Sequence, residues 1–235
     1  MSEFTVEIVR PDKLGMGASA SLELPATWAE FQDAMQQARI TDDTAYTYEL
    51  CYVERDWLRP HIPEESADLL ELNLLATRME KYIKDNMGVF EAMVQIEGGR
   101  HDGEPIPLPR LINMTFSLDE CPAVADIRSD KELGEFLYKN DFFTKEDAEA
   151  IQARLDSGRP VNDLYAILAR EHRANTGGVL TDSGRYVEFD GSTGKAYVPG
   201  ETEYFERTGA PVVLELSKNG KTAIYELPME SPNQR

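Results

Sequence analysis

Apolar and polar positions alternate in the first part of the chain. Residues 4–8 and 22–24 carry an apolar side chain at every second position, and the Gly-Met-Gly run at residues 15–17 separates them. Alternation with period two predicts strands that bury one face, and glycine between two strands predicts a turn. Residues 45–53 predict a third strand.

A change of period marks the first helix. Thr27 and Glu30 have the spacing of a capping box, and apolar side chains then recur at Trp28, Phe31 and Met35. Steps of three and four residues predict a helix that buries one side. We therefore expect a small β-β-α-β module over about residues 3–58.

Helical spacing continues in the middle of the chain. Apolar residues repeat in this way over residues 72–83, and a second helix is expected to end at Gly98-Gly99. His61-Ile62-Pro63 breaks the strand pattern and the helical region is predicted to follow it, so that the acidic residues 64, 68 and 71 share another face of the helix. Residues 111–118 and 123–127 predict strands.

Capping patterns indicate where later helices begin. Ser129 and Thr144 are each followed three residues later by an acidic side chain. The second of these helices is expected to bury three apolar residues, Ala148, Ile151 and Leu155. A last helix is predicted over residues 163–173.

Two hairpins are predicted near the end of the chain. Residues 179–189 are expected to turn at Asp182-Ser183-Gly184, and residues 212–227 at Asn219-Gly220. The elements together predict an α+β fold made of an elongated chain of small modules. The expected modules are a small β-β-α-β module over 1–60, a helical middle module over 61–100, a second α/β module over 101–190 and a β-hairpin extension over 191–235.

Charge is the unusual feature of the composition. The chain has 43 Asp and Glu against 24 Lys and Arg, a net charge of −19. Residues 1–190 hold 37 of the acids and 19 of the bases, whereas residues 191–235 are nearly neutral with 6 and 5. Such a charge opposes direct binding to nucleic acid or to an anionic membrane.

The remaining composition favours a cytoplasmic protein. No apolar run approaches the length that spans a bilayer, and the N-terminus lacks the basic and apolar regions of a signal peptide. The two cysteines lack CxxC spacing, so neither a disulfide framework nor a zinc site is indicated. Cys51 is expected in the core, because it alternates with aromatic residues, and Cys121 is expected to be partly exposed.

Motifs of catalysis are sparse. The chain contains no HExxH, GxSxG, GxxxxGK[ST] or EF-hand pattern, and its three histidines, His61, His101 and His172, are far apart in sequence. Neighbouring carboxylates such as Asp42-Asp43 could bind a metal, but adjacent side chains on a helix point apart. We predict no metal, no cofactor and no enzymatic activity.

The acidity itself has two interpretations. One is solubility, which needs no partner. The other is that carboxylates on successive helix turns, about 5.4 Å apart, imitate part of the phosphate charge of DNA. The candidate residues for such a surface are acids on predicted helices and turns: Asp42, Asp43, Glu64, Glu65, Asp68, Glu71, Glu146, Asp147 and Glu149.

Short stretches of the chain resemble the ArdA family of antirestriction proteins, which are carried by conjugative plasmids and transposons. These stretches are LELP at 22–25, ELNLLA at 71–76, ILARE at 167–171 and GGVLTD at 177–182. The resemblance covers roughly residues 3–189. It implies an elongated homodimer that mimics bent B-DNA and occupies the DNA groove of type I restriction-modification enzymes, without catalysis or cofactor.

Two alternatives stay open at the level of sequence. The near-neutral tail lies outside the resemblance, and its predicted hairpin could bind another protein while the acidity is incidental, as in a binding module of a mobile element. The chain could also be an enzyme with a carboxylate or histidine site that no motif reveals. A continuous track of acids favours mimicry, whereas a pocket that unites acids with a histidine favours an enzyme.

Overall fold

A computed structural model shows an α+β protein in two compact units, each described by itself. It describes residues 2–10, 18–41, 45–64, 69–193 and 197, and the backbone alone of residues 65–66, 202–205, 213–218 and 221–226. Unit 1 comprises Met1–Lys84, Gly103–Phe116 and Gly194–Arg235, and unit 2 comprises Asp85–Asp102 and Ser117–Thr193. The predicted fold class is confirmed.

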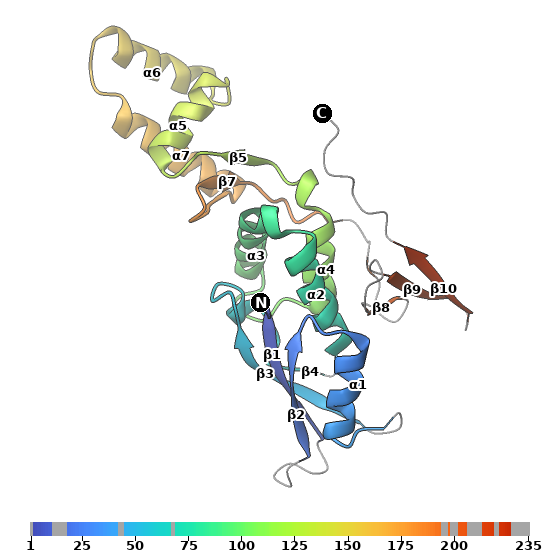
Figure 1. The fold of residues 1–235 in the computed structure, drawn as a ribbon. Coiled ribbons are helices and arrows are strands. Elements are labelled where there is room, and N and C mark those ends of the chain that lie inside the picture. Colours follow the sequence, from blue (N-terminus) through green and yellow to red (C-terminus); the bar gives the residue numbers. More distant parts are fainter. Residues whose placement is uncertain are drawn as a thin grey trace. The chain divides into compact units, whose positions relative to one another are not determined.

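Unit 1 begins with an antiparallel sheet of four strands in the order β2-β1-β3-β4. Its strands are β1 (Phe4–Val9), β2 (Ser19–Leu24), β3 (Thr47–Val53) and β4 (Glu65–Ser66). The alternate apolar residues of β1 are fully buried, and α1 (Trp28–Gln37) lies along one side of the sheet beside β2 (Figure 1). The predicted β-β-α-β order is confirmed, whereas the turn at Gly15-Met16-Gly17 lies outside the described residues.

The capping box of α1 forms as the sequence predicts. Glu30 N–H donates to Thr27 Oγ1 at 3.4 Å, and Thr27 N–H donates to the Glu30 carboxylate at 2.8 Å. The hydrogen bonds that the Thr27 N–H and hydroxyl donate to the Glu30 carboxylate lower the pKa of Glu30. Phe31 is buried as expected, but Trp28 is 41% exposed because it occupies the first turn, where it stacks on Phe31 with ring centroids 5.7 Å apart.

The predicted strand at residues 111–118 is wrong, because this segment forms helix α4 (Leu108–Phe116). Four of its five buried residues, Leu108, Leu111, Ile112 and Thr115, follow a spacing of three and four and so share one face, and the helix packs against α2 (Leu69–Lys81). The β-branched and aromatic side chains favoured a strand, and tertiary packing overrides that propensity.

A bidentate side chain joins α2 to the segment between β2 and α1. Asn73 is buried, and its amide nitrogen donates to Ala26 O at 3.2 Å while its Oδ1 accepts from Ala26 N–H at 2.7 Å. Asn73 therefore fixes the position of α2 relative to the start of α1 in the core of unit 1.

Unit 2 contains helix α3 (Met87–Arg100) and a three-stranded antiparallel sheet in the order β5-β7-β6. The strands are β5 (Ala123–Ala125), β6 (Val179–Leu180) and β7 (Arg185–Val187). The predicted hairpin around Asp182-Ser183-Gly184 is confirmed, and Gly184 adopts a φ of 78° that favours glycine. Helix α3 continues two residues past Gly98.

Three helices complete unit 2: α5 (Asp130–Lys139), α6 (Lys145–Asp156) and α7 (Asn162–Thr176), which lie grouped together in Figure 1. The caps predicted at Ser129 and Thr144 are confirmed. The backbone of α5 comes close to that of α7, because a Cβ on Gly134 would lie 2.3 Å from Tyr165 O. Helix α6 buries Ile151, but the other two residues predicted to be buried are not: Ala148 is half-buried and Leu155 is 42% exposed near the end of the helix.

The tail forms a second small sheet in unit 1, in the order β10-β9-β8. Its strands are β8 (Thr202–Phe205), β9 (Val213–Lys218) and β10 (Lys221–Glu226). The last two pair antiparallel with Lys218 opposite Lys221, so the predicted hairpin is present, although Asn219 and Gly220 lie outside the described residues. Within the described part of the chain, no helix is both long and apolar enough to cross a bilayer.

Candidate functional site

The acids predicted from sequence fall in three settings. Asp42, Asp43 and Asp68 lie outside the described residues, as does the side chain of Glu65. Glu64 is exposed, but the helix predicted to start near it begins at Leu69, and Glu65 belongs to the short strand β4. Glu71 lies in the first turn of α2, and the other three candidates lie together on α6.

The α6 acids serve the helix itself. Glu146 and Asp147 occupy its first turn, where the helix dipole favours negative charge. Asp147 accepts a hydrogen bond from the Thr144 hydroxyl at 2.6 Å, and Glu149 lies 3.7 Å from Lys145 Nζ. Two of the three candidates thus have a local structural partner, and Lys145 interrupts the negative surface.

A group of acids that the sequence interpretation missed lies on the solvent face of the unit 1 sheet. Strands β1, β2 and β3 contain three charged residues, Glu7, Glu23 and Glu49, and no lysine or arginine. All three alternate with buried apolar residues, so they point away from the core; Glu23 and Glu49 are exposed and Glu7 is half-buried. We call Glu7, Glu23 and Glu49 the sheet-face acids.

Strand register brings like charges together on this face. Glu7 lies directly opposite Glu49, and Glu49 lies opposite Glu65 in the backbone register of β4. Neighbouring strands are about 4.8 Å apart, and like charges directly opposite each other are destabilising. The Ser19 hydroxyl donates a hydrogen bond to Glu7 and offsets part of that repulsion. Alternation could have placed each glutamate on this face, but register depends on which strands pair.

The two cysteines reverse their expected settings. Cys51 is exposed, because it follows the inward Leu50 and shares the outer face of β3 with Glu49. Cys121 is buried, and its thiol donates to Glu188 O at 3.0 Å. Burial, together with the charges of Asp190 and Glu188, raises the pKa of the Cys121 thiol to about 11.

Unit 2, all of whose residues the structure describes, carries its acids at the surface. It has 20 Asp and Glu against 10 Lys and Arg, and among its carboxylates only that of Glu97 is buried. Glu97 accepts from Arg100 at 3.1 Å. Most of the negative charge of this unit therefore faces solvent; an exception is the half-buried Asp130, which pairs with Arg170 at 3.1 Å and Arg173 at 2.6 Å.

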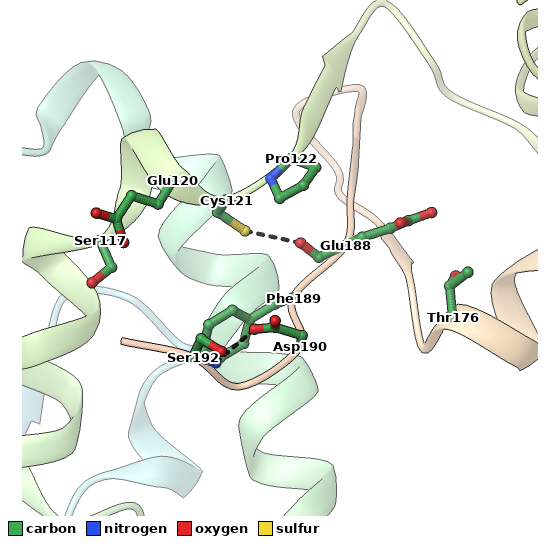
Figure 2. Close-up of a pocket in the computed structure, with 9 residues that line it drawn as sticks. All are labelled: Ser117, Glu120, Cys121, Pro122, Thr176, Glu188, Phe189, Asp190 and Ser192. Carbon is green, nitrogen blue, oxygen red and sulfur yellow. Dashed lines mark hydrogen bonds between the residues drawn. The ribbon is translucent and has the colours of Figure 1, made fainter. Parts of the chain in front are cut away.

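Unit 2 also contains a hollow with a cavity volume of about 390 Å³ (Figure 2). Figure 2 shows the Cys121 sulfur directed at the Glu188 backbone. It also shows the Asp190 carboxylate, which accepts a hydrogen bond from Ser192 N–H. The residues that line the hollow are Ser117, Glu120, Cys121, Pro122, Thr176, Glu188, Phe189, Asp190 and Ser192.

The hollow offers no activated nucleophile. The raised pKa keeps the Cys121 thiol protonated near neutral pH, and none of the three histidines lines the cavity. His172 Nε2 lies 2.9 Å from Glu188 Oε1, which also accepts from the Tyr186 hydroxyl at 2.8 Å. Glu188 thereby ties helix α7 to β7, which is a structural role. Over the described residues, no three His, Cys, Asp or Glu side chains are placed to hold a metal ion.

Comparison with known protein families, with curated proteins and with solved structures finds none that this chain matches.

Proposed function

We propose that this protein is a non-enzymatic DNA mimic of the antirestriction type, which occupies the DNA-binding groove of a type I restriction-modification enzyme in the cytoplasm. The observation that carries the proposal is the charge of the sheet face: three strands whose only charged residues are glutamates, two of them directly opposite each other. The surface acids of unit 2 and the resemblance to the ArdA family support the same function.

The mechanism is electrostatic. A groove that binds DNA presents lysine and arginine side chains, and its affinity depends on replacing counterions by fixed charges. Glutamates that lie opposite each other on neighbouring strands, whose backbones are about 4.8 Å apart, present such a groove with closely spaced anions. The uncharged Ser, Thr and Cys side chains between them leave no cation to repel the groove.

The proposed function also includes formation of a homodimer. A homodimer would present the sheet-face acids twice and lengthen the negative surface that one groove can hold. Direct binding of this chain to nucleic acid or membrane is not part of the function, since its charge of −19 opposes both.

A competition experiment tests the proposal. The protein is titrated into a complex of a purified type I enzyme with fluorescent duplex DNA, at salt concentrations between 50 and 200 mM. We expect full displacement of the duplex, and we expect direct binding of the protein to the enzyme to weaken about tenfold or more over that range. Absence of displacement at every salt concentration would overturn the proposal.

A further inference from the structure

The main chain of Tyr197, near the start of the tail, is held in unit 1 by one side chain of helix α4. Tyr197 N–H donates to Asn113 Oδ1 at 2.8 Å, and Asn113 Nδ2 donates to Tyr197 O at 3.0 Å. The Asn113 amide of α4 thus pairs with both backbone groups of one residue, as a neighbouring strand would. Tyr197 is 5% exposed, so the side chain is enclosed as well.

A second helix recognises the side chain. The Tyr197 hydroxyl donates to Glu71 Oε1 of α2 at 2.7 Å. Main-chain pairing accepts any residue other than proline, but this bond requires a phenol, because phenylalanine has no donor at that position. The two helices therefore form a socket that is selective for tyrosine.

The position of the socket gives it a mechanical role. Beyond Tyr197, strand β8 lies beside α2, and β8 is paired with β9 and β9 with β10. We propose that Tyr197 is a releasable latch that fastens the tail sheet to the face formed by α2 and α4, and that its release frees Glu71 from the phenol and opens that face. This inference does not depend on the proposed function.

Trypsin cleavage of the full chain tests the latch, because Lys195 lies two residues before Tyr197. Proteolysis requires local opening of the backbone around the cleaved bond. We expect Tyr197→Ala to accelerate cleavage after Lys195 about tenfold or more, and Tyr197→Phe, which removes one hydrogen bond, about fivefold. The matched control is Tyr52→Phe, which removes the 2.6 Å bond from an exposed tyrosine to Glu54 and should leave the rate unchanged.

Cleavage after the buried Arg78 reports unfolding of unit 1 in the same samples. If Tyr197→Ala also accelerates cleavage after Arg78, that variant has destabilised unit 1 as a whole, and Tyr197→Phe alone then tests the latch. Equal rates of cleavage after Lys195 in the wild-type chain and in Tyr197→Phe, with Arg78 protected in both, would overturn the latch.

Discussion

At the scale of single residues, buried hydrogen bonds explain more of the packing of this protein than charged side chains do. Asn73 and Asn113 each pair with both backbone groups of one residue, Ala26 and Tyr197. Cys121 and Glu188 likewise serve to hold β5, β7 and α7 together. Sequence could not predict these roles, because each depends on a partner 16 to 84 positions away in the chain.

Replacing Asn73 tests the strongest of these contacts. Asn73→Ala leaves the buried N–H and C=O of Ala26 without their partner, so we expect the free energy of unfolding of unit 1 to fall by about 2–4 kcal/mol. Hydrogen exchange of the β1 and β3 amides under native conditions measures this loss. Asn140→Ala is the control: its side chain bonds to Phe136 O at 2.8 Å on an exposed surface, and its loss should cost less than about 1 kcal/mol.

The two thiols should differ sharply in reactivity. Cys51 is exposed, whereas burial raises the pKa of Cys121 to about 11. At pH 8 we expect a maleimide to modify Cys51 quickly and Cys121 only after denaturation. The folded state holds the Cys121 proton more tightly than the unfolded state does. The contribution of this thiol to the free energy of unfolding is therefore fully present below about pH 8.5 and is lost as the pH rises toward 11. Rapid modification of both thiols in the native protein at pH 8 would contradict this account.

At the scale of elements, sequence predicted the features that depend on neighbouring residues better than those that depend on tertiary packing. The caps at Thr27, Ser129 and Thr144 lie next to the helices that they start, so sequence places these helix starts well. The strand expected at 111–118 is a helix because its packing against α2 decides its conformation. Sequence alternation also supports the outward direction of Glu7 and Glu49, but only the register of β1 and β3 sets them opposite each other.

The close approach of α5 and α7 makes a prediction at this scale. Gly134→Ala would place a Cβ 2.3 Å from Tyr165 O, so we expect unit 2 to lose about 1–3 kcal/mol of unfolding free energy despite the higher helix propensity of alanine. Gly99→Ala in α3 is the control, since nothing lies within 4 Å of its added Cβ. That variant should be neutral or more stable by up to about 1 kcal/mol. Urea unfolding followed by circular dichroism compares the two, and equal effects would refute the backbone contact.

At the scale of the whole molecule, the charge has more than one cause. The acids of α6 cap and pair within their own helix, and Glu71 holds Tyr197, so four of the nine residues expected to imitate DNA already have structural partners or positions. The sheet-face acids differ, because Glu7 and Glu49 lie directly opposite each other and the hydrogen bond from Ser19 to Glu7 offsets only part of their repulsion.

Cys51 provides a footprint of that surface, because it shares the outer face of β3 with Glu49. If the sheet face enters the groove, bound enzyme should slow alkylation of Cys51 about tenfold or more, measured by mass spectrometry of the complex. Addition of excess duplex DNA should restore the rate. An unchanged rate in the saturated complex would place the contact elsewhere on the protein.

The most direct measurement is inhibition of a type I restriction enzyme by two variants of equal charge. One combines Glu7→Gln, Glu23→Gln and Glu49→Gln; the other combines Glu54→Gln, Asp56→Asn and Glu104→Gln, which are exposed acids of unit 1 outside the strands. Each lost contact is worth about 0.5–1 kcal/mol, so we expect the first variant to inhibit more weakly than the wild-type chain by about tenfold or more, and the second by less than about threefold. Equal inhibition by both variants would contradict the claim that the sheet face imitates DNA.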